Sequence, residues 1–324
     1  VAEKDIYSSD SYAARFALGL KPADNITITP SVFYQDVTID DSSLVDINSS
    51  DMDNNDFKNG PFARPESHTD RFWLPALKAV VEFDNFSIIS NTSYITRKTT
   101  TASDDNTLNL AIFAEYYDPV PPPGFRDQFA FTDNKTSQKG FTQEIRLQNT
   151  SNGPLNWVVG AFYSRSVVKD QFGGANVKLL ETVNYGLQNA GIPPANSVAE
   201  LFGVEPYQGI YVVFQQSRYD DIQKSVFAQV DYEIVPRVTV TAGARYTDAK
   251  FKLDNFVAGP LVASDGIVVA ETTTSKPLTP KFGISFQADR NNLFYANAAK
   301  GVRGSGVSEQ AGIRCIDDGI NIGF

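Results

Sequence analysis

A few residues in this 324-residue sequence are of the types that carry out catalysis in other proteins. His68 is the only histidine and Ser67 precedes it, so a serine–histidine mechanism would have to use this pair. Because the pair falls in a polar stretch, we interpret His68 as a solvated loop residue. Asp231 and Glu233 share one face of a strand pattern, where they resemble an acid–base pair. A hydrogen-bonded polar wall accounts for them better, and no catalytic residue is predicted.

The run Asp-x-Asp-x-Asn at residues 51–55 resembles the opening of a calcium-binding EF-hand loop. The resemblance ends there, since position six is Asp56 rather than glycine and position twelve is Phe62 rather than glutamate. We therefore interpret residues 40–56 as an acidic surface loop. Weak calcium binding by this loop stays open, but no resident metal site is predicted.

Two other features are of types that take part in chemistry in other proteins, a glycine-rich stretch and a single cysteine. Gly301, Gly304 and Gly306 form a glycine-rich stretch, but no helix pattern follows that would present backbone N–H groups to a phosphate. We interpret them as a flexible loop. Cys315 is the only cysteine, so an internal disulfide is excluded and its partner is undefined. No cofactor is expected from these residues.

The stretch 226–247 has the pattern of a β-hairpin, and the rest of the chain repeats this pattern. Its first run alternates apolar residues with Gln229 and Asp231, and its second run, after a short turn, alternates them with Thr241 and Arg245. A period of two predicts two β-strands. One apolar and one polar face is typical of a membrane-spanning β-hairpin with lipid outside and water inside. A water-facing β-sandwich hairpin gives a similar pattern, so repetition must decide between the two.

Four further hairpins of this kind occur, at residues 12–34, 77–94, 141–163 and 282–299. Their turns are short, whereas long polar segments separate the hairpins at about 38–69, 99–138 and 169–216. Short turns at one end and long loops at the other are typical of outer-membrane barrels, while a β-sandwich would mix the two lengths. We therefore predict an all-β, transmembrane, antiparallel up-and-down β-barrel, of which this chain supplies about ten strands as five hairpins.

Three local features add detail to this prediction. Pro30 cannot donate to a strand ladder, which predicts a bulge or a locally free strand edge. Residues 198–202 predict a short helix inside the third long segment. In the last hairpin the second strand is ambiguous. Leu293, Tyr295, Asn297 and Ala299 are taken to continue the apolar face of Phe282, although Phe294 then falls on the opposite face.

Composition narrows the classes of function. Phe (23) and Tyr (14) are abundant and Met, Cys and His occur once each, as expected for an all-β chain. The net charge of −10 argues against nucleic acid as a partner, because such a partner requires a basic surface. No window approaches 18 consecutive apolar residues, so a transmembrane helix is not expected, whereas strands of about 10 residues suffice for a barrel.

Aromatic residues fall into two groups. Those near the strand ends on apolar faces, Trp157, Tyr163, Tyr232 and Tyr246, are interpreted as a girdle at the membrane interfaces. A second group lies in the long loops, where a ligand that arrives from outside would meet it. The candidate ligand-binding residues are Tyr116, Tyr117, Phe125, Arg126 and Tyr207. Packing within the loops is an alternative role for all five.

Three stretches resemble the barrel of TonB-dependent outer-membrane receptors. They are residues 141–163, with the runs FTQEIRL and WVVGAFY, residues 227–246, with FAQVDY and VTAGARY, and residues 280–303, which begin PKFG and end KGVR. The likeness covers most of residues 70–306, and the order and spacing of the three stretches match the family. The resemblance implies a 22-stranded barrel that is closed by an N-terminal plug, with a TonB-contacting box ahead of the plug.

The resemblance also implies a location and a function. We expect a protein of the Gram-negative outer membrane that takes up a scarce nutrient with energy from TonB, most often a ferric siderophore. Its partners would be TonB, that nutrient, outer-membrane lipid and lipopolysaccharide. Residues 1–324 would be an incomplete barrel domain that lacks the plug, the TonB box and the C-terminal strands. Alternatives are a cobalamin, haem or oligosaccharide receptor, a passive pore or adhesin, and a soluble carbohydrate-active β-protein.

Overall fold

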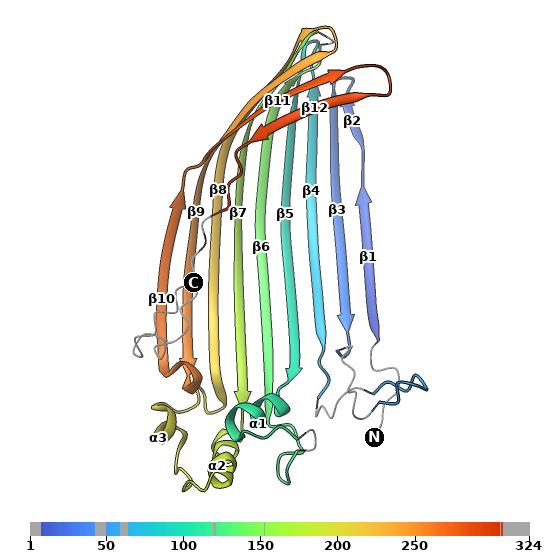
Figure 1. Ribbon diagram of the computed structural model, residues 1–324. Coiled ribbons are helices and arrows are strands. Elements are labelled where there is room, and N and C mark those ends of the chain that lie inside the picture. The colour runs from blue at the N-terminus through green and yellow to red at the C-terminus, as the bar shows by residue number, and fades with distance from the viewer. Residues whose placement is uncertain are drawn as a thin grey trace.

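The computed structural model describes residues 8–42, 50–58, 64–118, 121–151, 153–304 and 306. These residues form one antiparallel sheet whose long strands run side by side (Figure 1). Short turns join the strands at one end of the sheet, and three long connections lie at the other. We refer to them as the turn end and the loop end. Among the described residues, none of the helices is long and apolar enough to cross a membrane.

The described part of the chain forms twelve strands and a few short helices. The strands are β1 (Ser9–Ala17), β2 (Leu20–Ala23), β3 (Ile26–Ile39), β4 (His68–Glu82), β5 (Phe86–Asp104), β6 (Ala130–Asn149), β7 (Leu155–Asn176), β8 (Tyr211–Val235), β9 (Val238–Gly259), β10 (Ser264–Ser275), β11 (Leu278–Gln287) and β12 (Leu293–Ala299). The helices are α1 (Asn106–Ala114), α2 (Leu179–Asn189), α3 (Val198–Phe202) and the 3-10 turn η1 (Pro260–Val262).

Two pairs of these strands are single strands with a break, and each break lies at a proline. β1 and β2 both pair with β3, and the gap between them lies opposite Pro30. The Leu18 N–H donates to the Pro30 carbonyl at 3.0 Å, but proline has no N–H to return the bond. The predicted irregularity at Pro30 is therefore present. β10 and β11 both pair with β9 in the same way, and Pro277 lies between them.

With each broken strand counted once, the described sheet contains ten strands arranged as the five predicted hairpins. They follow one another in chain order from β1 at one edge to β12 at the other, as an up-and-down meander. The expectation that long loops alternate with all five hairpins is wrong at one place. Between the fourth and fifth hairpins the connection at the loop end is only the turn η1, because β9 and β10 continue further than the alternating pattern indicated.

The sheet has two chemically different faces over the half that lies nearer the turn end. The outer face carries large apolar side chains that stay exposed, such as Val226 (59%), Phe282 (61%) and Ile284 (49%). The inner face carries polar residues that are less exposed, among them Gln229 and Asp231. An exposed apolar surface of this extent must be covered by an apolar environment. The outer face is therefore the lipid-facing side, as the alternation predicted.

Aromatic residues mark where the apolar part of the outer face stops. In β7 the apolar run of the outer face extends from Leu155 to Tyr163, and in β5 the corresponding stretch, which includes Ser90 and Thr92, extends from Phe86 to Tyr94, which is nine residues in each case. A strand of about 9 to 11 residues suffices to cross a bilayer. The row of outer-face aromatics at the loop-end limit comprises Tyr12, Tyr34, Trp73, Tyr94, Phe141, Tyr163 and Tyr246. We call this row the aromatic girdle.

The last hairpin corrects the predicted face of its second strand. Phe286 pairs with Phe294 and Phe282 with Ala298, so Phe294, Ala296 and Ala298 share the outer face. The prediction that Leu293, Tyr295, Asn297 and Ala299 continue that face is wrong. The turn sets the register, since the Ala288 N–H donates to the Asn292 carbonyl at 3.0 Å. A shift of one residue in register moves every side chain to the other face.

The assignment of the two faces can be tested with one matched pair of variants. Ala242 lies on the exposed outer face, and Thr241 lies on the inner face beside the Asp231 carboxylate. Ala242→Arg in the complete protein should lower the free energy of unfolding in bilayers by roughly 2 to 4 kcal/mol, because the charge enters hydrocarbon. Thr241→Arg should cost much less, because the guanidinium meets water and Asp231. Equal losses for the two variants would contradict the assignment.

Candidate functional site

Three helices cover the loop end of the sheet and form the surface that a ligand from that side would meet first. The β5–β6 connection contains α1, and the β7–β8 connection contains α2 and α3 (Figure 1). The predicted helix at residues 198–202 is confirmed as α3. The Ser197 side chain accepts the Glu200 N–H at 3.1 Å at its start, and Gly203 ends it in the left-handed conformation. α1 and α2 were not predicted.

The two connections pack against each other through a small apolar core. Leu110, Phe125 and Phe129 are buried in it, at 2%, 6% and 0% exposure. Tyr185 of α2 packs against this cluster and contacts Phe125 edge-on, with 5.7 Å between the ring centroids. A second buried cluster joins α2 and α3 to the start of β8. The layer is therefore one packed unit built from two loops.

Buried amide side chains join the same two loops through hydrogen bonds. Asn106 accepts the backbone N–H groups of Phe129 and Ala130 at 3.1 and 2.9 Å, which ties the start of α1 to the start of β6. Asn176, which is 1% exposed, donates to the Asn109 side chain at 3.0 Å. Because buried polar groups are costly unless paired, these bonds fix the relative position of the loops. Asparagines are common in loops, so no sequence signal marked them.

Burial in the helical layer also shifts the pKa values of two of its titratable groups. Asp105 precedes α1, and its side chain accepts a hydrogen bond from the Thr132 hydroxyl. Burial nevertheless raises the pKa of the Asp105 carboxyl above its ordinary value. Burial also raises the pKa of the Tyr116 hydroxyl. Both groups therefore favour their neutral forms more than exposed residues of the same type do.

The five predicted ligand-binding residues lie in two separate places. Tyr116 and Phe125 both contact Tyr185, and Phe125 is buried in the core between the loops. Tyr117 is 78% exposed, and Arg126 is also exposed.

Tyr207 belongs to a different group of rings, because it packs against Phe214 and Phe256 in tilted arrangements, with 5.1 and 5.5 Å between the ring centroids. Among the predicted residues, only Tyr117 and Arg126 present freely exposed side chains, so loop packing accounts for the other three. Ligand binding by any of the five remains a prediction.

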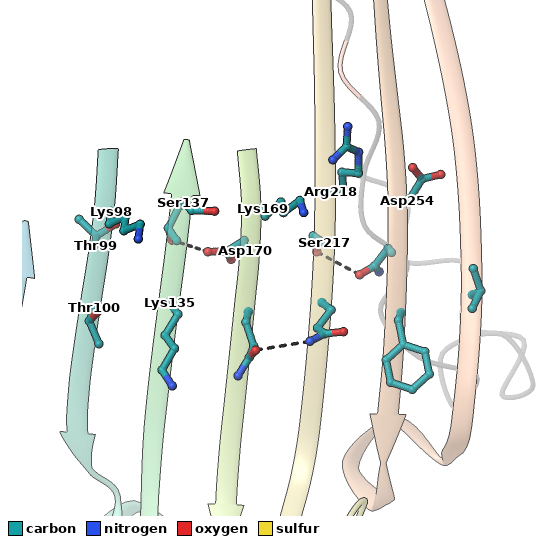
Figure 2. Close-up of a pocket in the computed structure, with 16 residues that line it drawn as sticks. Lys98, Thr99, Thr100, Lys135, Ser137, Lys169, Asp170, Ser217, Arg218 and Asp254 are labelled. Atoms are coloured by element: carbon teal, nitrogen blue, oxygen red, sulfur yellow. Dashed lines mark hydrogen bonds between the residues drawn. The ribbon is translucent and has the colours of Figure 1, made fainter. Parts of the chain in front are cut away.

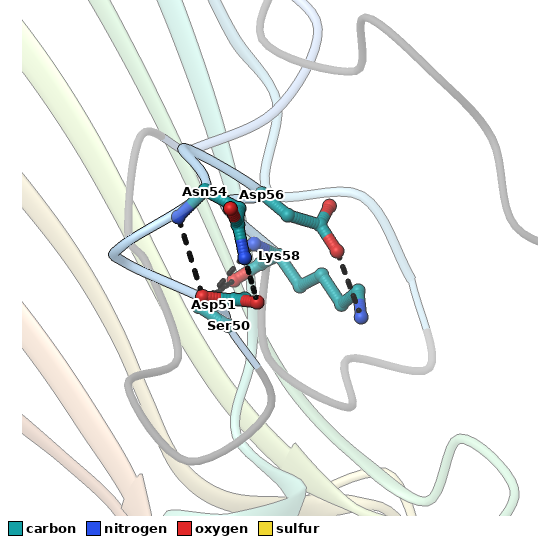
Figure 3. Close-up of polar contacts among 5 residues, drawn as sticks. All are labelled: Ser50, Asp51, Asn54, Asp56 and Lys58. Atoms are coloured by element: carbon teal, nitrogen blue, oxygen red, sulfur yellow. Dashed lines mark hydrogen bonds and ion pairs between the residues drawn. The ribbon is translucent and has the colours of Figure 1, made fainter.

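The acidic loop has a simple local structure in its described part, residues 50–58 (Figure 3). The Asp51 carboxylate accepts the backbone N–H of Asn54 at 3.3 Å and its side-chain amide at 2.7 Å. These bonds hold the pKa of Asp51 below its usual value. Asp56 forms an ion pair with Lys58 at 3.2 Å. Asp51 therefore closes a turn, and in the described residues no group of three or more His, Cys, Asp or Glu side chains could hold a metal ion.

Below the helical layer, polar side chains line the inner face down to the turn end. Arg146, Arg245 and Lys281 come from three strands and line a groove of about 450 Å³, with Glu144 at its rim. Arg245 donates to the Ser225 hydroxyl at 3.0 Å and lies over the Phe162 ring at 4.9 Å.

Lys281 donates to the Gln229 side chain at 3.4 Å. These contacts form the polar wall that the sequence predicted.

The residues considered for catalysis have structural roles. Asp231 accepts hydrogen bonds from Gln229 and Thr241, whereas Glu233 accepts the backbone N–H of Arg237 in the turn at 2.6 Å. The two carboxylates therefore do not act as a pair.

The expectation that His68 lies in a solvated loop is wrong. It begins β4, its backbone pairs with Thr101, and its ring nitrogen lies 2.8 Å from the Thr101 hydroxyl. Cys315 lies outside the described residues.

Comparisons with known proteins agree with this architecture. A family model described as "TonB dependent receptor-like, beta-barrel" matches residues 7–321. Among solved structures, the ferric yersiniabactin uptake receptor FyuA from Yersinia pestis is similar with a TM-score of 0.65 and 8% identity, covering 92% of this chain and 40% of that receptor.

Two other receptors are similar at lower scores. The ferric citrate transporter FecA in its unliganded form has a TM-score of 0.55 and 13% identity, covering 90% of this chain and 36% of FecA. The siderophore receptor PiuA from Acinetobacter baumannii has a TM-score of 0.53 and 15% identity, with coverage of 90% and 41%. The chain therefore spans about two fifths of the length of these proteins. At such identities the similarity concerns the fold alone.

The close contact between α1 and α2 provides a test of the packed layer. A Cβ atom on Gly186 would lie 2.8 Å from the Ala114 Cα and 2.9 Å from the Phe113 carbonyl oxygen, both backbone atoms. Gly186→Ala should therefore push the helices apart and destabilise the layer by about 1 to 3 kcal/mol. Faster proteolysis within the two loops of the complete protein measures this effect. Gln188→Ala, an exposed position on α2, is the control and should cleave like the wild type.

Proposed function

Because this chain belongs to the family of TonB-dependent receptor β-barrels, we propose that the complete protein takes up a scarce nutrient with energy delivered by TonB. The described sheet is part of the barrel wall in the bacterial outer membrane. We further propose a ferric siderophore as the nutrient. The structurally similar receptors whose names state a substrate act on ferric yersiniabactin or ferric citrate, and a third is named a siderophore receptor.

The observation that carries the proposal is the polar inner wall. It includes the hydrogen-bonded Asp231 near the turn end and the groove around Arg245 further toward the loop end. Such polar side chains offer hydrogen bonds to water, as the lumen of a transport barrel requires. Its cations, which include Arg146 and Lys281, would attract an anionic solute.

We propose that the other parts of the transporter lie in sequence outside this chain. In the described sheet, β1 and β12 are edges without a second neighbour. Unpaired strand edges are not stable in hydrocarbon, and this supports the proposal that further strands complete the wall. We propose that these strands, a plug in the lumen and a TonB-contacting segment come from the rest of the protein. TonB would then act on the plug, and the helical layer would meet the ligand from outside.

Uptake measurements in cells test the transport proposal. The complete protein, expressed in a strain without its own siderophore receptors, should accumulate radioactive iron from a ferric siderophore only when TonB and the proton gradient are intact. The reason is that a plugged barrel needs mechanical work to open. Uptake that persists without TonB, or steady conductance of the protein in planar bilayers, would instead support a passive pore. TonB-dependent uptake of cobalamin, haem or an oligosaccharide but not iron would change the substrate.

The orientation of the barrel can be tested separately by chemical labelling. Outer-membrane barrels place short turns in the periplasm and long loops outside. In a Cys315→Ser background, Arg126→Cys in the helical layer should react with an impermeant maleimide on intact cells. Asn85→Cys, in the short turn between β4 and β5, should react only after the outer membrane is broken. Equal labelling of the two cysteines on intact cells would contradict the orientation.

A further inference from the structure

Three polar side chains lie on the lipid-facing side of β5 and β6, inside the apolar belt. Ser90 and Thr92 share the outer face of β5 with Tyr94, and Gln143 shares that of β6 with Phe141. All three lie on the turn-end side of the aromatic girdle. Polar groups are costly in hydrocarbon unless they are paired, so a surface covered only by lipid does not account for them. We call Ser90, Thr92 and Gln143 the polar cluster.

The polar cluster pairs only part of its own hydrogen-bonding groups. The Gln143 side chain donates to the Ser90 hydroxyl oxygen at 2.9 Å and accepts a hydrogen bond from the Thr92 hydroxyl. Within the described chain, the Ser90 hydroxyl has no acceptor for its own hydrogen, and the Thr92 hydroxyl oxygen accepts no hydrogen bond. The cluster therefore keeps a spare donor and a spare acceptor, and a second copy of the cluster can pair both.

Beyond the girdle, the same part of the outer face carries positive charge (Figure 2). Lys98 comes from β5, Lys135 and Lys139 come from β6, and Lys169 comes from β7. The register places both Lys98 and Lys169 opposite Ser137, so they share one face of the sheet. All four lysines are exposed, and within the described parts of the chain none has an ion-pair partner. We call them the basic band.

Two carboxylates close to the basic band are paired with arginines and do not neutralise it. Asp133 of β6 pairs with Arg64 at 2.8 Å. Asp220 of β8 pairs with Arg165 at 2.7 Å. The band therefore keeps its positive charge on a chain whose net charge is −10.

The other flank of the same face is acidic. Asp10 of β1 lies two positions beyond Tyr12, and Asp40 follows β3, six positions beyond Tyr34. The Asp40 N–H donates to the Ser8 carbonyl at 3.0 Å, which continues the ladder of β1 and β3 to this position. Asp10 and Asp40 are exposed, and in the residues that the structure describes neither has an ion-pair partner. We call these two residues the acidic flank.

The opposite charges lie at matching distances from the girdle. Counted along each strand from its girdle residue, Lys139 and Asp10 are both two positions out. Lys135, Lys169 and Asp40 are all six positions out. The order across the sheet is acidic on β1 and β3, then β4, then basic on β5 to β7. The polar cluster, on β5 and β6, lies near the middle of this span.

A surface of this kind is complementary to itself. Two copies in one membrane have the same orientation, so residues at equal distance from the girdle are at equal depth. A two-fold axis along the membrane normal places each flank of one copy against the opposite flank of its partner. The basic band of each copy then meets the acidic flank of the other, and the two polar clusters approach each other near the axis.

We propose that the outer face of β1 to β7 is an interface between two copies of the complete receptor. Ion pairs between the basic band and the acidic flank hold it beyond the girdle, and hydrogen bonds between the two polar clusters hold it in the membrane. Complementary charge sets the register of such a contact, while hydrogen bonds between polar side chains stabilise association in hydrocarbon. The proposal does not depend on transport or on the nutrient.

Complementary charge reversal in the complete receptor tests the ion pairs. One variant carries Lys135→Glu and Lys139→Glu, and the other carries Asp10→Lys and Asp40→Lys. Each variant alone should dimerise at least about tenfold more weakly than the wild type, because like charges then meet. A mixture of the two variants should dimerise like the wild type, since every contact again joins opposite charges. Energy transfer between labelled copies in phosphatidylcholine liposomes measures dimerisation.

The control for charge reversal uses the same face at the same depth on another strand. Lys250 and Lys252 of β9 are exposed and lie four and six positions beyond Tyr246. The variant Lys250→Glu, Lys252→Glu should dimerise like the wild type. A wild-type receptor that stays monomeric in these liposomes would overturn the proposal. Weakened dimers that the mixture does not restore would also overturn it, and would assign the basic band to a lipid or another anionic ligand.

A second experiment tests the contact inside the membrane. The variant Ser90→Ala, Thr92→Val, Gln143→Leu should dimerise about threefold to thirtyfold more weakly, because hydrogen bonds between the copies are lost. The change makes the lipid-facing surface more apolar, so insertion into the liposomes should not suffer. The control Ala242→Val, Ala244→Val adds apolar volume to the outer face of β9 and should dimerise like the wild type. Dimers of the triple variant that are as stable as those of the wild type would contradict the proposal.

Discussion

The structure depends on one constraint, which is that every backbone N–H and C=O group inside a membrane must be paired within the protein. An unbroken antiparallel ladder satisfies it, and each strand here pairs with its neighbours in chain order from β1 to β12. Pro30 and Pro277 lie where this ladder is interrupted, because proline has no N–H to donate. With the backbone occupied in this way, only side chains can meet lipid or the lumen. Their alternation then determines the two faces.

The polarity of the outer face records the depth of each residue relative to the membrane. Below the girdle it is apolar, and Phe282 and Val226 remain exposed because lipid rather than protein covers them. Beyond the girdle it carries charge, from Arg165 to Lys98, although the strands and their register continue. The inner face carries polar groups at the depth where the outer face is apolar, and its Arg245 is in contact with Ser225 and with the Phe162 ring. The outer face of this one sheet thus meets hydrocarbon below the girdle and a charged interface beyond it, while the inner face meets water.

The sequence predicted those parts of the strands in which one face meets a single environment, such as lipid, along its whole length. All five hairpins, and the two faces of every strand except the last, follow from local pattern, because lipid on one side enforces a strict period of two. The short helix α3 was also predicted. The strand ends were missed since the apolar alternation stops at residues such as Tyr163, where water replaces lipid, and the same change hid the start of β4 at His68. The layer of α1 and α2 depends on contacts between distant loops, such as Asn109 with Asn176, which no local pattern reveals.

The amide contacts at the loop end have a consequence for how the entrance moves. The Asn176 bond to Asn109 and the ring contact of Tyr185 with Phe125 join connections that lie far apart in the chain. Neither loop can move away without breaking contacts inside a shared core, so we expect the two loops to move together and not independently. A solute that displaces one of the two loops must therefore also disturb the other.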